Sequence, residues 1–289
     1  MGEQVTVPGE QIIRLGAFFG VLAAVSVWEV VAPRRTLTDR KPRRWLTNLS
    51  MVAVDTAAGR FLMPILPVGA ALLAEERSWG VLNLMHLPSP LKVVIAVVAL
   101  DFVIYLQHVL FHFLPVLWRL HRMHHTDLDI DVTTGNRFHP VEILISLGIK
   151  LAAVLVIGPS APAVVIFETL LNATSQFNHG NIRMPFSLDR WLRLVVVTPD
   201  MHRVHHSVIP RETNSNFGFN LPWWDRLCGT YRPQPEAGHT GMTIGLKEFR
   251  NPDRLTFFHL LVQPFLRQSK TQNPTDLAGS PSSPPRNTH

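Results

Sequence analysis

The chain has 289 residues, an apolar content of 46% and a formal charge of +6 at pH 7. Its single cysteine, Cys228, excludes an intrachain disulfide and a cysteine zinc cluster, and is typical of a reducing compartment. The apolar residues form long stretches, such as residues 93–118, where Asp101 is the only formally charged residue. Stretches of about 20 apolar residues span the hydrocarbon layer of a bilayer, so membrane helices are favoured over a soluble helical core.

Five apolar segments follow one another along the chain, at residues 12–32, 45–74, 91–117, 141–157 and 163–177. We expect the second segment to bend where Pro64 and Pro67 interrupt it, with its first half at the membrane interface. A Gly-Pro-Ser-Ala-Pro turn at residues 158–162 predicts a hairpin between the last two segments. The tail at residues 268–289 is rich in Pro, Ser, Thr and Asn and is predicted to be disordered.

Six basic residues lie between the first and second segments: Arg34, Arg35, Arg40, Lys41, Arg43 and Arg44. A cluster in this place fits the positive-inside rule better than nucleic-acid binding, so we expect a cytoplasmic loop and no nucleic-acid partner. Tracing the segments from that loop brings the polar residues 119–138 and His179 back to the cytoplasmic side. The predicted fold is an all-α integral membrane protein with four to five membrane helices and a cytoplasmic, histidine-rich helical cap.

Eight of the fourteen histidines occur in three short boxes: His108 and His112, then His121, His124 and His125, then His202, His205 and His206. Residues three or four apart share a helix face, so each box can direct its rings into one pocket. His179 is a further candidate ligand, and His139 is either a ligand or a donor to one. Imidazole suits Zn, Cu, Fe and Ni, and one ion accepts about four to six ligands. These histidines therefore predict two metal ions in one cage.

Asp101 and Tyr105 precede the first box on the same helix face as His108 and His112. A carboxylate inside a membrane segment is costly, which makes Asp101 a functional candidate. We expect Asp101 or Tyr105 to support a ligand histidine through a hydrogen bond. The alternative role for Asp101 is a structural ion pair with a buried base such as Arg60.

Two metal chemistries stay open on these residues alone. A zinc hydrolase keeps an open metal position beside a general base, and it rarely needs so many imidazoles. Two iron ions can bind and split O2, which attack on an unactivated C–H bond of a lipid requires. A membrane site that faces the cytoplasm suits a long apolar substrate and a soluble electron donor.

A series of motifs resembles the fatty acid hydroxylase/sterol desaturase superfamily in order and spacing. The motifs are Asp101, Tyr105, His108 and His112, then residues 121–125 (HRMHH), 137–142 (RFHPVE), 177–181 (FNHGN) and 199–206 (PDMHRVHH). Residues 212–218 (ETNSNFG) and 224–231 (WDRLCGTY) resemble its bacterial sterol desaturase branch. The likeness covers residues 101–231, which is less than half of the chain.

The resemblance implies a non-haem di-iron oxidoreductase of the bacterial inner membrane that uses O2 to hydroxylate or desaturate a sterol, fatty acyl chain or related lipid. The histidine boxes would hold the two irons. We find no haem domain and no flavin or nicotinamide fingerprint, so we expect an external electron donor, such as a cytochrome b5-like protein, a ferredoxin or a reductase. The His-x-x-x-His spacing of the first box does not select a substrate.

Two alternatives stay open. One is a non-enzymatic membrane protein that binds or transports metal, which would need ionisable residues along a path through the bilayer. The other is a superfamily member with a different reaction, such as lipid ether cleavage or hydrolysis. In either case we divide the chain into N-terminal membrane helices and basic loop (1–90), a catalytic region (91–232), a C-terminal extension (233–267) and the tail (268–289).

Overall fold

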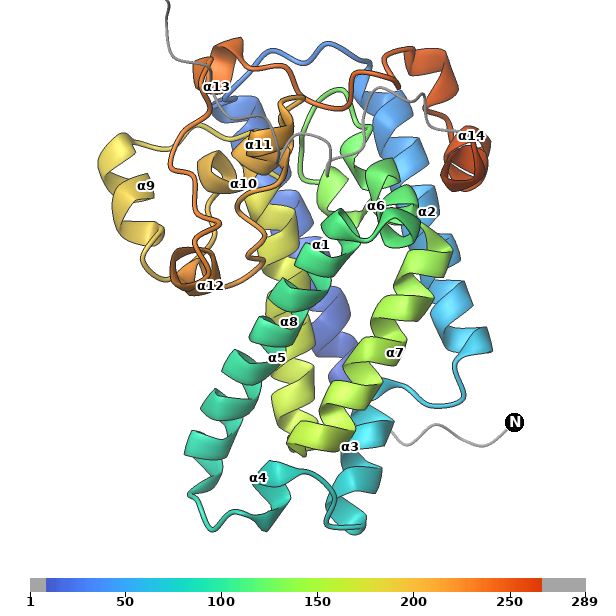
Figure 1. The fold of residues 1–289 in the computed structure, drawn as a ribbon, viewed down its shortest axis with the longest axis vertical. Coiled ribbons are helices and arrows are strands. Elements are labelled where there is room, and N and C mark those ends of the chain that lie inside the picture. The colour runs from blue at the N-terminus through green and yellow to red at the C-terminus, as the bar shows by residue number, and fades with distance from the viewer. Residues whose placement is uncertain (1–8, 267–289) are drawn as a thin grey trace, which may run out of the picture.

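The computed structural model describes residues 9–266, whose long helices form a bundle that carries a cap at one end (Figure 1). The long helices are α1 (Glu10–Val31), α2 (Lys41–Leu62), α3 (Pro67–Glu76), α5 (Ser89–Phe113), α7 (Pro140–Ile157) and α8 (Ala161–Asn178). The described residues contain no named strand, and the predicted all-α fold is confirmed. The predicted disordered tail, residues 268–289, lies outside the described residues.

The cap consists of short helices at the upper end of the bundle in Figure 1, whereas α4 (Val81–Leu84) lies at the lower end. The elements of the cap are α6 (Pro115–His125), η1 (Thr134–Asn136), α9 (Phe186–Leu192), α10 (Pro199–His205), α11 (Pro210–Thr213), α12 (Trp223–Leu227), α13 (Gly238–Gly241), η2 (Pro252–Arg254), α14 (Phe257–Val262) and η3 (Gln263–Phe265). Within the C-terminal extension, η3 packs against α6 and α14 packs against α2. The extension therefore covers the helix that carries the second histidine box.

Within residues 9–266, four helical segments are long and apolar enough to cross a membrane. They are α1, the stretch Lys41–Leu84 that contains α2 to α4, α5, and α7. The fifth predicted segment forms α8, which is not among these four. It packs against α1, α3 and α5 and carries Glu168, which pairs with Arg14 and Lys150. Because neighbouring helices cover α8, fewer of its side chains have to be apolar.

Proline and glycine residues set the ends of the membrane helices. Pro64 and Pro67 do more than bend the second segment, because α2 ends at Leu62 and α3 begins at Pro67. The predicted turn between α7 and α8 is confirmed, with Gly158 at φ +70° after the end of α7. A Cβ on the facing Gly80 would lie 2.4 Å from the Gly158 Cα atom, so only glycine allows the two backbones to meet.

A buried ion network fixes the cap to the start of α2. Arg44 binds both carboxylate oxygens of Asp127, at 2.8 and 2.9 Å, and one oxygen of Asp131 at 2.6 Å. Burial disfavours the charged carboxylate of Asp127, but Arg44 and Arg137 outweigh this and hold the pKa of Asp127 below its usual range. Thr134 donates to Asp127 as well, so the network fixes the loop that leads into η1.

The basic cluster between α1 and α2 belongs to this scaffold. Five of its six side chains have partners within the protein: Arg34 pairs with Asp200, Arg35 donates to the His239 and Met242 carbonyls, Lys41 pairs with Glu29, Arg43 with Asp253, and Arg44 with Asp127 and Asp131. Structural contacts thus account for charges that we assigned to the positive-inside rule. The cytoplasmic orientation of the cap stays a prediction.

Replacing Arg44 with alanine should destabilise the protein strongly, because it removes the cation that binds two buried carboxylates directly. We expect the free energy of unfolding in detergent to fall by about 3–5 kcal/mol. The matched control is Arg40→Ala, since Arg40 belongs to the same cluster but is exposed, and its loss should cost no more than about 0.5 kcal/mol. Equal unfolding free energies for the two variants would contradict the assigned role of the network.

Candidate metal centre

Nine of the ten predicted ligand histidines come together in two groups where the bundle meets the cap. The five-histidine group contains His108, His112, His121, His125 and His205, and the four-histidine group contains His124, His179, His202 and His206. In each group the candidate ligand atoms all lie within 4.8 Å of one another, and all nine residues are buried. The groups adjoin, because the rings of His125 and His206 stack with their centroids 4.7 Å apart.

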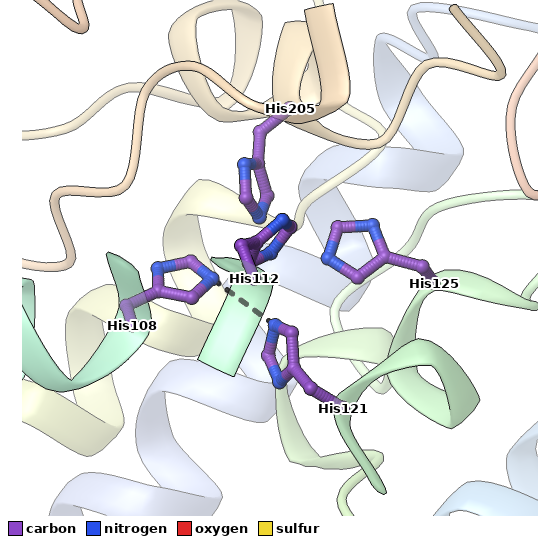
Figure 2. Close-up of side chains that lie close together, drawn as sticks. All are labelled: His108, His112, His121, His125 and His205. Carbon is purple, nitrogen blue, oxygen red and sulfur yellow. Dashed lines mark hydrogen bonds between the residues drawn. The ribbon is translucent and has the colours of Figure 1, made fainter. Parts of the chain in front are cut away.

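Each His-x-x-His-His box divides its rings between the two groups. His121 and His125, four residues apart on α6, enter the five-histidine group, where they face His108, His112 and His205 (Figure 2). His124, between them in the chain, enters the other group. The box on α10 does the reverse, because His202 and His206 enter the four-histidine group and His205 crosses over. The boxes therefore face two adjacent sites, not one pocket each.

Backbone carbonyls fix the orientation of rings in the five-histidine group. The Nδ1 atom of His108 lies 2.7 Å from the Phe217 carbonyl oxygen, and Nδ1 of His205 lies 2.7 Å from the Ser215 carbonyl oxygen. A carbonyl oxygen only accepts hydrogen bonds, so each Nδ1 carries the proton. The Nε2 atom of each neutral ring therefore keeps a free lone pair, as a metal ligand requires.

Glu142 performs the same task for His121 with a carboxylate. Its Oε1 atom lies 2.6 Å from His121 Nδ1. The Nε2 atom of His121 then lies 3.1 Å from Nε2 of His108, along the dashed line in Figure 2. When Glu142 is ionised, both rings carry their protons on Nδ1, and this is an approach of two lone pairs, which repel each other unless a cation lies between them.

The four-histidine group is built in the same way around His179. His179 donates from Nδ1 to the Ser175 carbonyl at 2.7 Å, and His124 donates from Nδ1 to the Arg137 carbonyl at 3.2 Å. The Nε2 atom of His179 lies 3.1 Å from Nε2 of His124, 3.1 Å from Nε2 of His202 and 3.2 Å from Nε2 of His206. Four imidazole nitrogens thus converge on one point.

These separations match ligands of one ion. Two nitrogens that bind an ion at about 2.1 Å lie about 3.0 Å apart at a right angle and about 3.4 Å apart at the tetrahedral angle. Several ring nitrogens in the described structure are also buried without a hydrogen-bond partner: Nε2 of His112, both nitrogens of His125, Nδ1 of His202 and Nε2 of His205. Buried polar atoms are rarely left unpaired, and metal ions would satisfy those that face the two groups.

Burial keeps the cap histidines neutral, which ligand histidines must be. It lowers the pKa of His121 to about 3 and that of His179 to about 4. Burial, reinforced by neighbouring imidazoles, also holds the pKa of the other cap members well below the ordinary value: His124, His125, His202, His205 and His206. At neutral pH these rings offer lone pairs without first having to lose a proton.

The structure does not bring His139 into either group. Its Nδ1 atom accepts a hydrogen bond from the Val141 backbone N–H at the start of α7, and its Nε2 atom lies 3.1 Å from the Leu261 carbonyl oxygen. Both ring nitrogens are therefore engaged in capping a helix and binding the C-terminal extension. The ligand role that we considered for His139 is not supported by this placement.

Asp101 and Tyr105 do not make the hydrogen bond to a histidine that we expected. Asp101 instead accepts hydrogen bonds from the Trp224 indole at 2.8 Å and from the Leu221 backbone at 3.2 Å. The Tyr105 hydroxyl lies 2.9 Å from the Thr230 hydroxyl. Asp101 therefore acts one step further out, because it holds the end of segment 214–221, whose carbonyls orient His108 and His205. Tyr105 contacts Thr230, whose backbone carbonyl accepts a hydrogen bond from Asn216 of that segment.

Sequence reasoning missed three residues that shape the site. Glu142 lies in the RFHPVE motif at residues 137–142, but its spacing from His121 gave no sign that the two would meet. Asn214 places its side-chain oxygen 3.2 Å from His112 Nδ1. Gly135 packs so closely on α8 that a Cβ there would lie 2.3 Å from the Ser175 oxygen that holds His179. These contacts join distant parts of the chain, so no local pattern reveals them.

A cavity of about 1000 Å³ extends from the five-histidine group into the bundle. His108 and His121 form part of its wall, together with Phe111 and Phe219. Further from the histidines it is lined by residues of α2, α3, α5, α7 and α8, among which polar and apolar side chains are about equally frequent, although most of the surface exposed to the cavity is apolar. Its size and apolar lining suit a drug-sized or larger apolar ligand.

Comparison with known proteins points to one family. Residues 93–230 match the family model described as fatty acid hydroxylase. An ornithine lipid hydroxylase of Rhizobium tropici is 30% identical over 185 residues, which cover 64% of this chain and 54% of that protein. No solved structure matches the chain significantly.

Alkylglycerol monooxygenases are similar over a comparable length of the chain. The protein of Xenopus tropicalis is 30% identical over 174 residues, covering 59% of this chain and 38% of its own length. The human protein is 29% identical over 185 residues, covering 63% and 40% respectively. The chain thus spans about half, or less, of the length of these curated relatives. The matched region, the ordered histidine boxes and the helical fold agree, and they support membership of the fatty acid hydroxylase superfamily for residues 93–230.

Proposed function

We propose that this protein is a membrane-bound lipid hydroxylase that holds two iron ions and uses O2 with an external electron donor. The observation that carries the proposal is the convergence of unprotonated imidazole nitrogens on two adjacent points beside a large, mostly apolar cavity. The relatives, an ornithine lipid hydroxylase and alkylglycerol monooxygenases, support a lipid substrate and favour hydroxylation over desaturation.

The five-histidine group would hold one iron and the four-histidine group the other. Bound there, the ions would supply the capacity to reduce O2 and oxidise an unactivated C–H bond, which imidazole side chains alone lack. In the overall reaction, one oxygen atom enters the C–H bond and the second leaves as water. The balance requires two electrons and two protons, and the electrons come from the external donor.

The protein's own residues supply position and protection. Glu142 and the carbonyls of Phe217 and Ser215 hold the rings in the ligand tautomer, and this second layer of contacts supports metal affinity. The Phe138 ring stacks on His124 with centroids 4.7 Å apart, which fixes the plane of that imidazole. Phe111 and Phe219 line the cavity beside His108 and His121, where they exclude water from the reacting carbon.

We further propose that the cap faces the cytoplasm of a bacterial cell, where a ferredoxin, a reductase or a cytochrome b5-like protein could deliver electrons. Two features support this orientation. Arg40, the one member of the basic cluster without a side-chain contact described above, is exposed beside the cap, and Cys228 is exposed as a free thiol, which suits a reducing compartment.

Lipid ether cleavage is the second candidate, favoured by the alkylglycerol monooxygenase relatives. It needs the same site, because hydroxylation of the carbon bonded to an ether oxygen gives a hemiacetal that separates into an aldehyde and an alcohol. A metal transporter is less well supported. Glu168 inside the bundle pairs with Arg14 and Lys150, and the histidines collect at one end.

The purified protein should contain about two irons per chain, one for each histidine group. His205→Ala removes a ligand of the five-histidine group, and His179→Ala removes the ring at the centre of the other. We expect each variant to retain about one iron by elemental analysis, whereas the exposed His86→Ala control should keep both. Stoichiometric zinc after iron-replete, metal-clean expression would contradict the iron assignment.

Gly135→Ala should weaken the four-histidine group without removing a ligand. The added methyl group would displace the Ser175 carbonyl and the ring of His179, so iron should fall to about one per chain. Gly148→Ala is the matched control, since a Cβ at that position of α7 meets nothing within 4 Å. Full iron occupancy in Gly135→Ala would show that the contact does not position His179.

Lipid mass spectrometry should reveal the reaction. We expect one lipid class to be lighter by one oxygen atom than in the parent strain, both when the gene is deleted and when it carries His124→Ala. Restoring the unchanged gene should return the oxygenated lipid. Release of a fatty aldehyde together with an alcohol would instead select ether cleavage. A mass difference of two hydrogens would show that the reaction is desaturation and not hydroxylation.

A further inference from the structure

The polar side chains in the cavity wall differ in whether the protein satisfies them. Gln107 and Ser146 lie within hydrogen-bond distance of each other: the Ser146 hydroxyl oxygen is 2.9 Å from the Gln107 amide nitrogen and 3.2 Å from the Gln107 amide oxygen. Glu168 binds Lys150 with one oxygen and Arg14 with the other, both at 2.6 Å. These groups need no ligand, because their partners are already in place.

Two carboxyl groups in the same wall are not satisfied. Asp55 on α2 is only 8% exposed, and its Oδ1 atom has no hydrogen-bond partner in the described structure. Glu142 on α7 is 4% exposed, and its Oε2 atom also lacks a partner while Oε1 holds His121. Buried carboxyl oxygens are normally hydrogen-bonded, so both atoms mark a place where a donor from outside the protein fits.

The packing of α2 on α7 brings these carboxyls to the same side of the cavity. A Cβ on Gly59, one turn after Asp55, would lie only 3.1 Å from the Leu147 side chain of α7. The absence of a side chain at Gly59 therefore lets α2 approach the first turns of α7, where Glu142 lies. Asp55, Gly59, Leu147 and Glu142 all line the cavity that His108 and His121 reach.

We propose that Asp55 binds a hydroxyl or ammonium group of the lipid substrate, so the substrate is an amphiphile that carries a hydrogen-bond donor and not a plain hydrocarbon chain. This inference rests on the proposed function, because it takes the cavity as the substrate site. The donor satisfies the Asp55 oxygen, with Glu142 at the same wall, and the apolar chain lies against residues such as Ile104 and Leu171. A charge-assisted hydrogen bond is stronger than a neutral one, so an ammonium group should bind most tightly.

Binding of three probes with the same chain length tests this directly: hexadecylamine, 1-hexadecanol and hexadecyl methyl ether, the last of which has no donor. Each would compete with radiolabelled hexadecanol on the purified, metal-loaded protein. We expect the amine and the alcohol to bind at least about tenfold more tightly than the ether, as loss of one hydrogen bond to a charged group predicts. Equal affinities for the three probes would overturn the proposal.

Variants assign the preference to Asp55. Asp55→Leu should abolish it, and Asp55→Asn should reduce the affinity for the amine more than that for the alcohol. Ser146→Ala is the matched control in the same wall and should leave the preference intact. A preference that persists in Asp55→Leu would refute the assignment, and if that variant fails to fold, an unchanged preference in Asp55→Asn would refute it equally.

The outcome is separable from that of the proposed function, because binding and iron content are measured without turnover. An Asp55-dependent preference in a protein that binds no iron would leave this inference standing and overturn the iron assignment. Full iron occupancy with equal probe affinities would overturn only the inference about the substrate. If the alcohol alone is preferred over the ether, the donor is a hydroxyl group; if the amine exceeds both, it is an ammonium group.

Discussion

The structure depends on one electrostatic constraint: imidazole lone pairs are directed at one another inside a protein that gives them no other partner. Acceptors fixed elsewhere in the fold, such as the carbonyls of Phe217 and Ser175 and the carboxylate of Glu142, hold protons on Nδ1 and leave Nε2 bare. Bare nitrogens at 3.1 Å repel unless a cation lies between them. Ions in the two groups would convert this repulsion into coordination, so metal binding and folding of the cap should be linked.

The division of the histidine boxes explains how two short helices can serve two ions. On α6 the rings four residues apart face the five-histidine group, and the ring of His124 faces the other. On α10 the arrangement is reversed, so that His205 crosses from the four-histidine side. Each helix therefore contributes to both groups, and neither group can form unless α6 and α10 are packed together. The buried network around Arg44, and the segment 214–221 held by Asp101, secure that packing.

Periodicity and motif order predicted the helical fold, the turn at Gly158 and the set of histidines that meet, because these features are written locally in the chain. They did not predict which ring enters which group, since residues three and four positions along a helix lie about 60° and about 40° to opposite sides of the first residue, and a broadly shared face does not fix where each ring ends. The roles of Asp101 and Tyr105 were also misplaced, because spacing showed a shared helix face but not the loop that packs against it. We assigned the basic cluster to membrane topology, yet Arg44 forms an ion pair with Asp127 inside the protein. Charge composition alone therefore cannot distinguish basic residues that set membrane orientation from basic residues that stabilise the fold.

The most direct test of the account is X-ray absorption at the iron edge of the purified protein. Nine histidines shared between two ions predict a first shell with four to five nitrogens per iron at about 2.1 Å, and with the outer-shell scattering of imidazole rings. Such a spectrum, with about two irons per chain, would confirm that the two groups are metal sites. A shell dominated by oxygen or sulfur, or one with no more than two imidazoles per ion, would contradict the central claim.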